Sequence, residues 1–386
     1  MKRLITLFAA LGCAGALQAQ EVADSGSFFV RLGTDTIAVE RYTRTRLQLV
    51  SEAISRTPVL RQMKLTITFK DDGSVSWWEI VNSPVPGIPG QLPVLRQVVT
   101  LIGDSANVEL WSGGVQRPTR KIAAHPRQVP LITPFYSTYE IAVQRARRLS
   151  ADTTLTMATI GGPLAYTIKF AAPDSITLLH PQSGTNVLKL DKVGRLTRFN
   201  GEGTTFKVMV TRSRPVDVQT YAARFAKSEK ARPFGALSPR DTLEVSVGDA
   251  DVLMIDYSRP SKRGRVIFGG IVPWDQVWRT GANAATQLIV SKPIEVNGKV
   301  VPPGKYTLWT VPSRQGWQLI INKQTGQWGT VYDSKLDLVR VPLTVESVAV
   351  PVETFTISAA DKGGRNGALS FAWDRVRATL PFKVVD

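Results

Sequence analysis

The sequence predicts an all-β protein of two units. The first is an N-terminal antiparallel β meander, rolled into a barrel or half-barrel with one helix, and the second is a C-terminal antiparallel β-sandwich. Runs of β-branched and aromatic residues recur at spacings of roughly ten residues, separated by turn-forming residues, as in meanders and sandwiches. At 386 residues the chain is also long enough to bury two cores.

The N-terminus has the pattern of a secretory signal peptide, predicted over residues 1–19. Lys2 and Arg3 precede an apolar run that is too short to span a bilayer, and small residues lead to an expected cleavage after Ala19. Alternatively, Cys13 is the acylated residue of a lipoprotein, although the residues before it match that pattern imperfectly. We therefore expect an exported protein, periplasmic or extracellular, without disulfides.

The first unit, residues 21–226, is predicted to consist mostly of antiparallel strands. Asp71-Asp72-Gly73 is a hairpin signal between two β-branched runs, and the proline-rich segment 82–92 is a loop because its prolines lack backbone donors. Strands are predicted at 28–32, 66–68, 75–80, 153–160, 164–170, 175–179, 186–190, 196–199 and 206–210.

One helix is predicted in this unit, from Ser137 to Leu149. Ser137 and Glu140 have the spacing of a capping box, in which each side chain bonds the other residue's backbone amide. Tyr139, Val143 and Ala146 recur on one helical face, which predicts that this face is buried.

A change of composition marks the second unit. Charged residues, two prolines and a glycine between 227 and 240 indicate a linker, and the sandwich is expected over 241–386. Alternating residues at 243–247 and 252–257, and again at 306–310 and 317–321, predict strands with one buried and one wet face.

The chain is strongly basic, with a net charge of +17. This excess favours anionic surfaces by long-range attraction, but it is also compatible with an ordinary basic surface. Nucleic acid is not an expected partner because the protein is predicted to be exported, and the longest basic cluster, 145–148, lies within the predicted helix. The oligomeric state is not predictable.

The stretch 256–283 concentrates cations and aromatic residues, and it is the candidate site. Guanidinium groups can bind a carboxylate or phosphate with two parallel bonds while a sugar ring stacks on indole, so we expect an anionic or carbohydrate-like ligand of the cell envelope. Its cations are Arg259, Lys262, Arg263, Arg265 and Arg279. The candidate ligand-binding residues are Ser258, Arg259, Arg265, Trp278, Arg279, Asn283 and Trp328.

The alternative is a purely structural interpretation of this stretch, in which its residues only stabilise the fold. Arg265 and Arg279 would then pair with Asp256 and Asp275, and the tryptophans would fill the core. Core positions are the default for tryptophans on alternating strands. This holds for Trp309, Trp317 and Trp373.

No catalytic, metal or cofactor signature accompanies the stretch. As a nucleophile, Ser258 would need a base, but the second unit has no histidine, and His125 and His180 precede prolines in loops where surface positions are expected. One alternative is a cell-envelope hydrolase that uses Asp256 or Asp275 with a second acid. Another is a hydrophobic-ligand carrier formed by the first unit.

Several motifs of the second unit together resemble a known family. They are Tyr257-Ser258-Arg259-Pro260, Lys262-Arg263-Gly264-Arg265, Phe268-Gly269-Gly270, Trp278-Arg279-Thr280-Gly281-Ala282-Asn283, Pro303-Gly304-Lys305-Tyr306 and Gln327-Trp328-Gly329. With this set, residues 251–382 resemble the bacterial family called domain of unknown function 2911. The resemblance implies domain limits but no activity and no catalytic residues.

Overall fold

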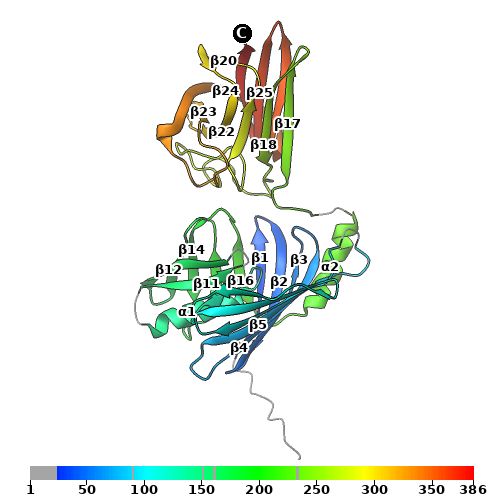
Figure 1. The fold of residues 1–386 in the computed structure, drawn as a ribbon, viewed down its shortest axis with the longest axis vertical. Coiled ribbons are helices and arrows are strands. Elements are labelled where there is room, and N and C mark those ends of the chain that lie inside the picture. Colours follow the sequence, from blue (N-terminus) through cyan, green and yellow to red (C-terminus); the bar gives the residue numbers. More distant parts are fainter. Residues whose placement is uncertain (1–23, 89–90, 150–151, 160–161, 232–233) are drawn as a thin grey trace, which may run out of the picture.

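The computed structural model of the protein describes residues 24–88, 91–149, 152–159, 162–231 and 234–386. The predicted signal peptide, residues 1–19, lies outside the described residues, as does Cys13. In the described part of the chain the strands form two sheets, one for each unit, and almost all neighbours are antiparallel (Figure 1). The all-β fold class is therefore confirmed.

The first unit is a single 16-stranded sheet. Its strands are β1 (Asp24–Leu32), β2 (Asp35–Arg44), β3 (Gln48–Ser55), β4 (Arg61–Phe69), β5 (Val75–Pro84), β6 (Leu95–Ile102), β7 (Ser105–Ser112), β8 (Val115–Gln116), β9 (Arg120–Ala123), β10 (Val129–Pro130), β11 (Thr153–Thr159), β12 (Gly162–Ala172), β13 (Ser175–His180), β14 (Gly184–Leu190), β15 (Leu196–Asn200) and β16 (Met209–Ser213). β1 pairs with both β2 and β16, so the ends of the meander meet in mid-sheet. The strand path runs from β10 to β8 without closing among the described residues, so the sheet is the half-barrel form of the prediction.

Helix α1 (Ser137–Arg148) packs its apolar face into the main core of this sheet. Tyr139, Val143 and Ala146 are buried, as predicted. The predicted capping box is wrong, because Glu40 on β2 accepts hydrogen bonds from the Ser137 amide and hydroxyl. A carboxylate is a stronger acceptor than a hydroxyl at the positive end of a helix, so Glu40 takes over the capping role.

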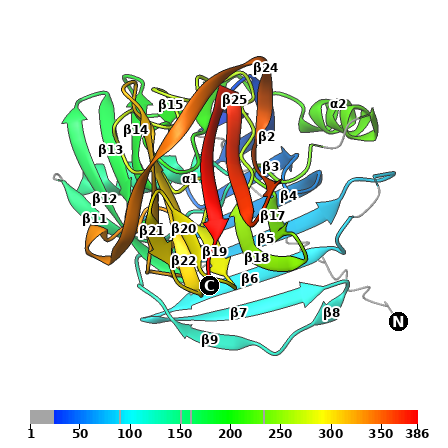
Figure 2. The same ribbon diagram turned by 90° about the horizontal axis from the view of Figure 1, so that it is seen from above.

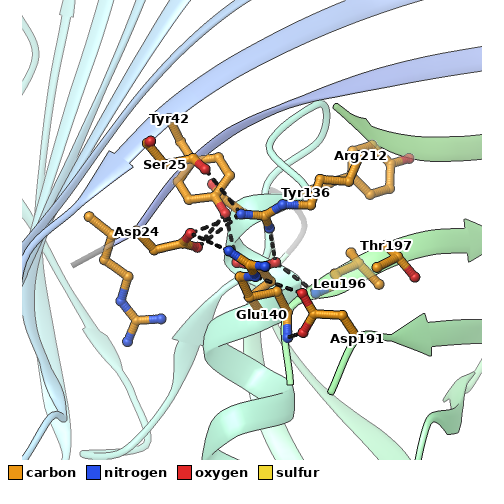
Figure 3. Close-up of polar contacts among 12 residues, drawn as sticks. Asp24, Ser25, Tyr42, Tyr136, Glu140, Asp191, Leu196, Thr197 and Arg212 are labelled. Atoms are coloured by element: carbon orange, nitrogen blue, oxygen red, sulfur yellow. Dashed lines mark hydrogen bonds and ion pairs between the residues drawn. The ribbon is translucent and has the colours of Figure 1, made fainter. Parts of the chain in front are cut away.

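Glu140 is thereby free to join a second buried network, which ties α1 to four strands, β1, β2, β15 and β16 (Figure 3). Its carboxylate accepts hydrogen bonds from the amide of Leu196, 2.7 Å away, and from the guanidinium of Arg212, 2.5 Å away. Arg212 also bonds Asp24 at 3.0 Å, and the Tyr42 hydroxyl lies within hydrogen-bonding distance of both carboxylates, 2.6 Å from Asp24 and 3.1 Å from Glu140. These polar groups satisfy one another, so we interpret the network as structural.

Stability should fall as pH rises from about 5 to 8. Burial raises the pKa of both Glu40 and Glu140 from 4.5 to about 7. Because each folded-state pKa lies above its unfolded value, each carboxyl stabilises the fold below pH 4.5 and loses that contribution as pH passes 7. The loss is roughly 3 kcal/mol per group. Urea unfolding across this range should show a shallower fall for Glu40→Gln than for the wild type, and equal slopes would contradict the assignment.

The sequence predicted one helix, and the structure adds a second, α2 (Val218–Ala231), which packs on β2 and β3. Asp217 caps it by accepting from the amides of Gln219 and Thr220. Val218, Ala222 and Phe225 are buried at helical spacing, so the apolar periodicity typical of a helix is present in the sequence, although no helix was predicted there. The helix extends into the segment expected as a linker, 227–240.

The second unit is a nine-stranded antiparallel assembly. Its elements are β17 (Arg240–Val247), β18 (Ala250–Ser258), β19 (Thr286–Val290), β20 (Ile294–Val296), β21 (Lys299–Val301), β22 (Gly304–Val311), β23 (Trp317–Asn322), the 3-10 helix η1 (Ser334–Leu336), β24 (Asp337–Gly363) and β25 (Asn366–Val384). The start of β24 pairs with β23, and its later part pairs with β25, so this one long strand belongs to both layers of the sandwich. Trp309, Trp317 and Trp373 are buried, as predicted.

Candidate functional site

The candidate site is a cleft of about 620 Å³ between the two units. The second unit lies over one end of the half-barrel (Figures 1 and 2). The half-barrel lines the cleft with segments 179–184 and 203–207, and the second unit lines it with segments 271–283 and 328–331. Clefts between domains are common positions for ligand sites.

Contacts at the rim hold the two units together. The turn between β1 and β2 donates the Thr34 amide to the Arg263 carbonyl at 3.2 Å. The Arg263 guanidinium pairs with Asp35 at 3.0 Å and lies 4.0 Å from the centre of the Phe234 ring. On the other side, the Thr330 hydroxyl donates to the Gln182 carbonyl at 3.0 Å. Part of the basic stretch therefore serves to dock the units.

Three cations line the cleft without a carboxylate partner among the described residues: Lys207 from the first unit, and Arg265 and Arg279 from the second. Lys207 donates to the Glu202 carbonyl at 2.7 Å, and Arg265 donates to the carbonyls of Ser261 and Lys262. Nε of Arg279 is buried with no hydrogen-bond partner in the described chain. No Asp or Glu lines the cleft. These three cations therefore lie in the cleft lining without an ion pair, although Glu202 acts electrostatically on Lys207, and Glu353 and Asp35 act on Arg265, from outside the lining.

The pKa values of Lys207, Arg265 and Arg279 are all lowered. Burial lowers the pKa of Arg279 to about 10, and burial together with Arg263 lowers the pKa of Arg265 to about 10. Burial also lowers the pKa of Lys207, and the charges of Arg279 and Arg265 lower it further. Both arginines remain charged at neutral pH, so the cleft has a positive field that an anion would relieve.

The turn after Trp278 aims Arg279 into the cleft. Thr280 has φ 53°, which is unusual for a β-branched residue, and its carbonyl accepts from the Thr286 hydroxyl at 2.7 Å. Asn283 and Lys207, both in the cleft lining, also have positive φ values of 59° and 56°. Left-handed non-glycine residues cost energy and concentrate at functional sites.

Two indoles flank the cations. Trp278 is mostly buried and stacks on Trp373 with ring centres 5.8 Å apart, and both indoles are part of the cleft lining. Trp328 is 39% exposed and can present a face to a ligand. Asn283 is exposed beside it, and its carbonyl accepts from the Gly329 amide at 3.0 Å.

The structure brings together five of the seven predicted ligand-binding residues: Arg265, Trp278, Arg279, Asn283 and Trp328. Ser258 and Arg259 are absent from the cleft lining, which corrects the prediction for both. Ser258 is buried, and Gly281 packs closely against its backbone. Arg259 pairs with Asp241 and bonds Thr356.

Three other cations of the basic stretch, for which the sequence predicted no pairing, form ion pairs. Arg259, Lys262 and Arg263 pair with Asp241, Asp374 and Asp35, respectively. The pairing that the structural interpretation predicted is wrong for Arg265 and Arg279, since Asp256 pairs instead with Arg240 and Asp275 does not line the cleft. These two cations are the ones left for a ligand.

The residues from the first unit were not predicted. His180 lines the cleft, contrary to the expected surface position, while His125 is exposed as expected. Nδ1 of His180 accepts from the amides of Gln182 and Ser183, which leaves the proton of the neutral ring on Nε2. Burial lowers its pKa. Lys207 and Phe206 lie in an irregular segment before β16, which corrects the strand predicted over 206–210, since the strand begins only at Met209.

The cleft holds no recognisable catalytic set. No acid lines it, so the carboxylate pair required by the hydrolase alternative is missing there. The described residues contain no cluster of three or more potential metal ligands. No helix of the described chain is long and apolar enough to cross a membrane.

Fold and cleft together define this chain as a two-unit all-β protein with a cation-lined cleft between a half-barrel and a sandwich. Residues 238–382 match the family model described as "Protein of unknown function (DUF2911)", which confirms the resemblance for the second unit. No curated protein sequence matches the chain.

Two solved structures are similar to about half of the chain. A DUF1089 family protein from Pseudomonas aeruginosa has 14% identity and a TM-score of 0.32, and covers 50% of this chain and 95% of its own. A beta-barrel-like protein of domain of unknown function DUF1849 from Brucella abortus has 11% identity and a TM-score of 0.30, and covers 49% and 96%. Neither similarity carries an argument about function.

Proposed function

We propose that this protein binds an anionic group, without catalysis, in the cleft between its two units. The observation that supports this is the convergence of Lys207, Arg265 and Arg279 on a cleft whose lining contains no carboxylate. Leaving several cations partly buried and unpaired is costly, and pairing them with an anion relieves that cost. A bound anion would supply the missing partner.

The chemistry of the lining narrows the class of anion. Arginine is suited to planar carboxylates and to phosphates, which it can bind through two parallel hydrogen bonds. The exposed Trp328 offers a stacking surface for a ring next to the charged group. We therefore propose a carboxylate or phosphate ester as the recognised group, with a sugar acid or sugar phosphate as one form of it.

We also propose that binding takes place after export, in the periplasm or outside the cell. The motivating observation is the charged, apolar and small-residue pattern of residues 1–19. A cell-envelope location would make anionic glycans and lipid headgroups the accessible ligands. Fractionation of cells expressing the full chain would test the location, and recovery of the uncleaved chain from the cytoplasm would contradict it.

The binding proposal can be tested by titrating the protein with glucose 1-phosphate, glucuronate, inorganic phosphate and glucose while following tryptophan emission and heat. The charged probes should bind and glucose should not, because the cations dominate the cleft. Added sodium chloride should weaken binding by screening. Equal binding of glucose, or no heat with any charged probe at millimolar concentration, would contradict the proposal.

A further inference from the structure

A second cavity, of about 440 Å³, lies within the half-barrel. Its walls come mainly from apolar side chains of the concave side, among them Leu131, Leu164 and Val208. Arg61 lines it as well and, like the cleft cations, has no carboxylate partner among the described residues. No Asp or Glu is part of this lining, so nothing in it would repel an anionic molecule.

This apolar cavity and the cationic cleft share part of their lining. His180, Phe206 and Leu237 belong to both. Phe206 is 57% exposed, although large apolar side chains are normally buried, and its ring lies 6.3 Å from that of His180. An apolar side chain at the border between a charged space and an apolar one would be covered by a ligand that extends through both.

We propose, building on the proposed function, that the ligand is a single-chain anionic amphiphile. Its head would lie among Lys207, Arg265 and Arg279, and its hydrocarbon chain would pass Phe206 into the cavity of the half-barrel. The positive charge of the cleft favours an anionic head group. Because the cleft and the cavity share part of their lining, the site favours a molecule that also has a hydrocarbon chain. The two units would then be halves of one site, which explains why the cations lie at the junction.

The test compares butyl, octyl and dodecyl phosphate with octyl and dodecyl trimethylammonium, all below their micellar concentrations, by calorimetry on the full chain. Each methylene that becomes buried is expected to tighten Kd about fourfold. We expect octyl phosphate to bind at least tenfold more tightly than butyl phosphate. The ammonium compounds should bind at least tenfold more weakly than the phosphates of equal length.

A variant that fills the apolar cavity shows where the hydrocarbon chain of the ligand lies. Leu164→Trp, which fills the apolar cavity, should abolish the gain from butyl to octyl while leaving butyl phosphate binding unchanged. The matched control is Ala165→Trp, because Ala165 is exposed on the opposite face of β12 and should keep the full gain. If Leu164→Trp does not fold, as judged by circular dichroism, Leu164→Gln serves the same purpose, because it makes the wall of the apolar cavity polar at a residue that does not line the cleft.

The outcomes separate the two proposals. If butyl and octyl phosphate bind equally, anion binding stands and the amphiphile inference is wrong. If the longer chain binds more tightly but Leu164→Trp does not change the gain, the chain lies elsewhere and the inference is again wrong. If no phosphate of any length binds, the proposed function itself fails.

Discussion

Arg279→Gln is expected to weaken binding of the anionic probes by about 10- to 100-fold. Arg279 has no partner in the described chain, so its hydrogen bonds to a ligand are not offset by bonds lost inside the protein. A hydrogen bond to a charged group contributes about 1.5 to 3 kcal/mol, which corresponds to this range of affinity. Calorimetric titration of the variant with glucose 1-phosphate and octyl phosphate measures the effect.

Two further variants show whether the loss arises from the cleft. Arg377→Gln removes the same charge from an exposed arginine that pairs with Glu346 outside the cleft, and it should bind like the wild type. Gly329→Ala should reproduce much of the loss, since a Cβ there would lie 1.9 Å from Cδ of Arg279 and must displace that side chain. If Arg377→Gln weakened binding equally, the loss would arise from the change in net charge and not from the cleft.

The largest expected loss of stability follows from Arg212→Leu, which should lower the free energy of unfolding by about 3 to 5 kcal/mol. Arg212 neutralises Glu140 and Asp24, whose side chains are only 2% and 19% exposed. Without the guanidinium, Glu140 would remain buried with its charge uncompensated. Urea unfolding at pH 8, followed by circular dichroism, measures this loss.

The loss should depend on pH in a defined direction. The charge of Arg212 lowers the pKa of Glu140 against the effect of burial. Removing Arg212 raises the folded-state pKa of Glu140 further above its unfolded value. As pH falls, Glu140 therefore becomes protonated in the folded variant, and the variant regains part of its stability relative to the wild type. The destabilisation should be smaller at pH 5 than at pH 8, whereas Arg377→Leu should cost less than about 0.5 kcal/mol at both.

The strands and the buried faces were predictable because they depend on local periodicity. The meander from 153 to 200 appears as alternating runs, and the aromatic alternation around Trp309 and Trp317 predicted burial correctly. Helix α1 was predictable from its apolar face, but not its cap, because the capping Glu40 comes from a strand far away in the sequence.

The candidate site was predictable only on the side where the sequence is compositionally unusual. Arg265, Arg279 and the indoles belong to the basic, aromatic segment and the family motifs, whereas Lys207 lies in an ordinary loop of the other unit and His180 at the end of its strand β13. Whether an arginine is available to a ligand depends on which acids lie within reach. Asp35 and Asp374 form ion pairs with Arg263 and Lys262, and both acids are distant from these cations in the sequence.

By itself, the sequence determined the all-β class, the family of the second unit, and the segment richest in guanidinium and indole groups. Only the tertiary structure decided which of those cations remain unpaired, and that a loop of the half-barrel adds a third cation and opens toward an apolar cavity. The physical reason is that strand formation follows from neighbouring side chains, whereas charge neutralisation and cavity shape arise from contacts made when the two units meet.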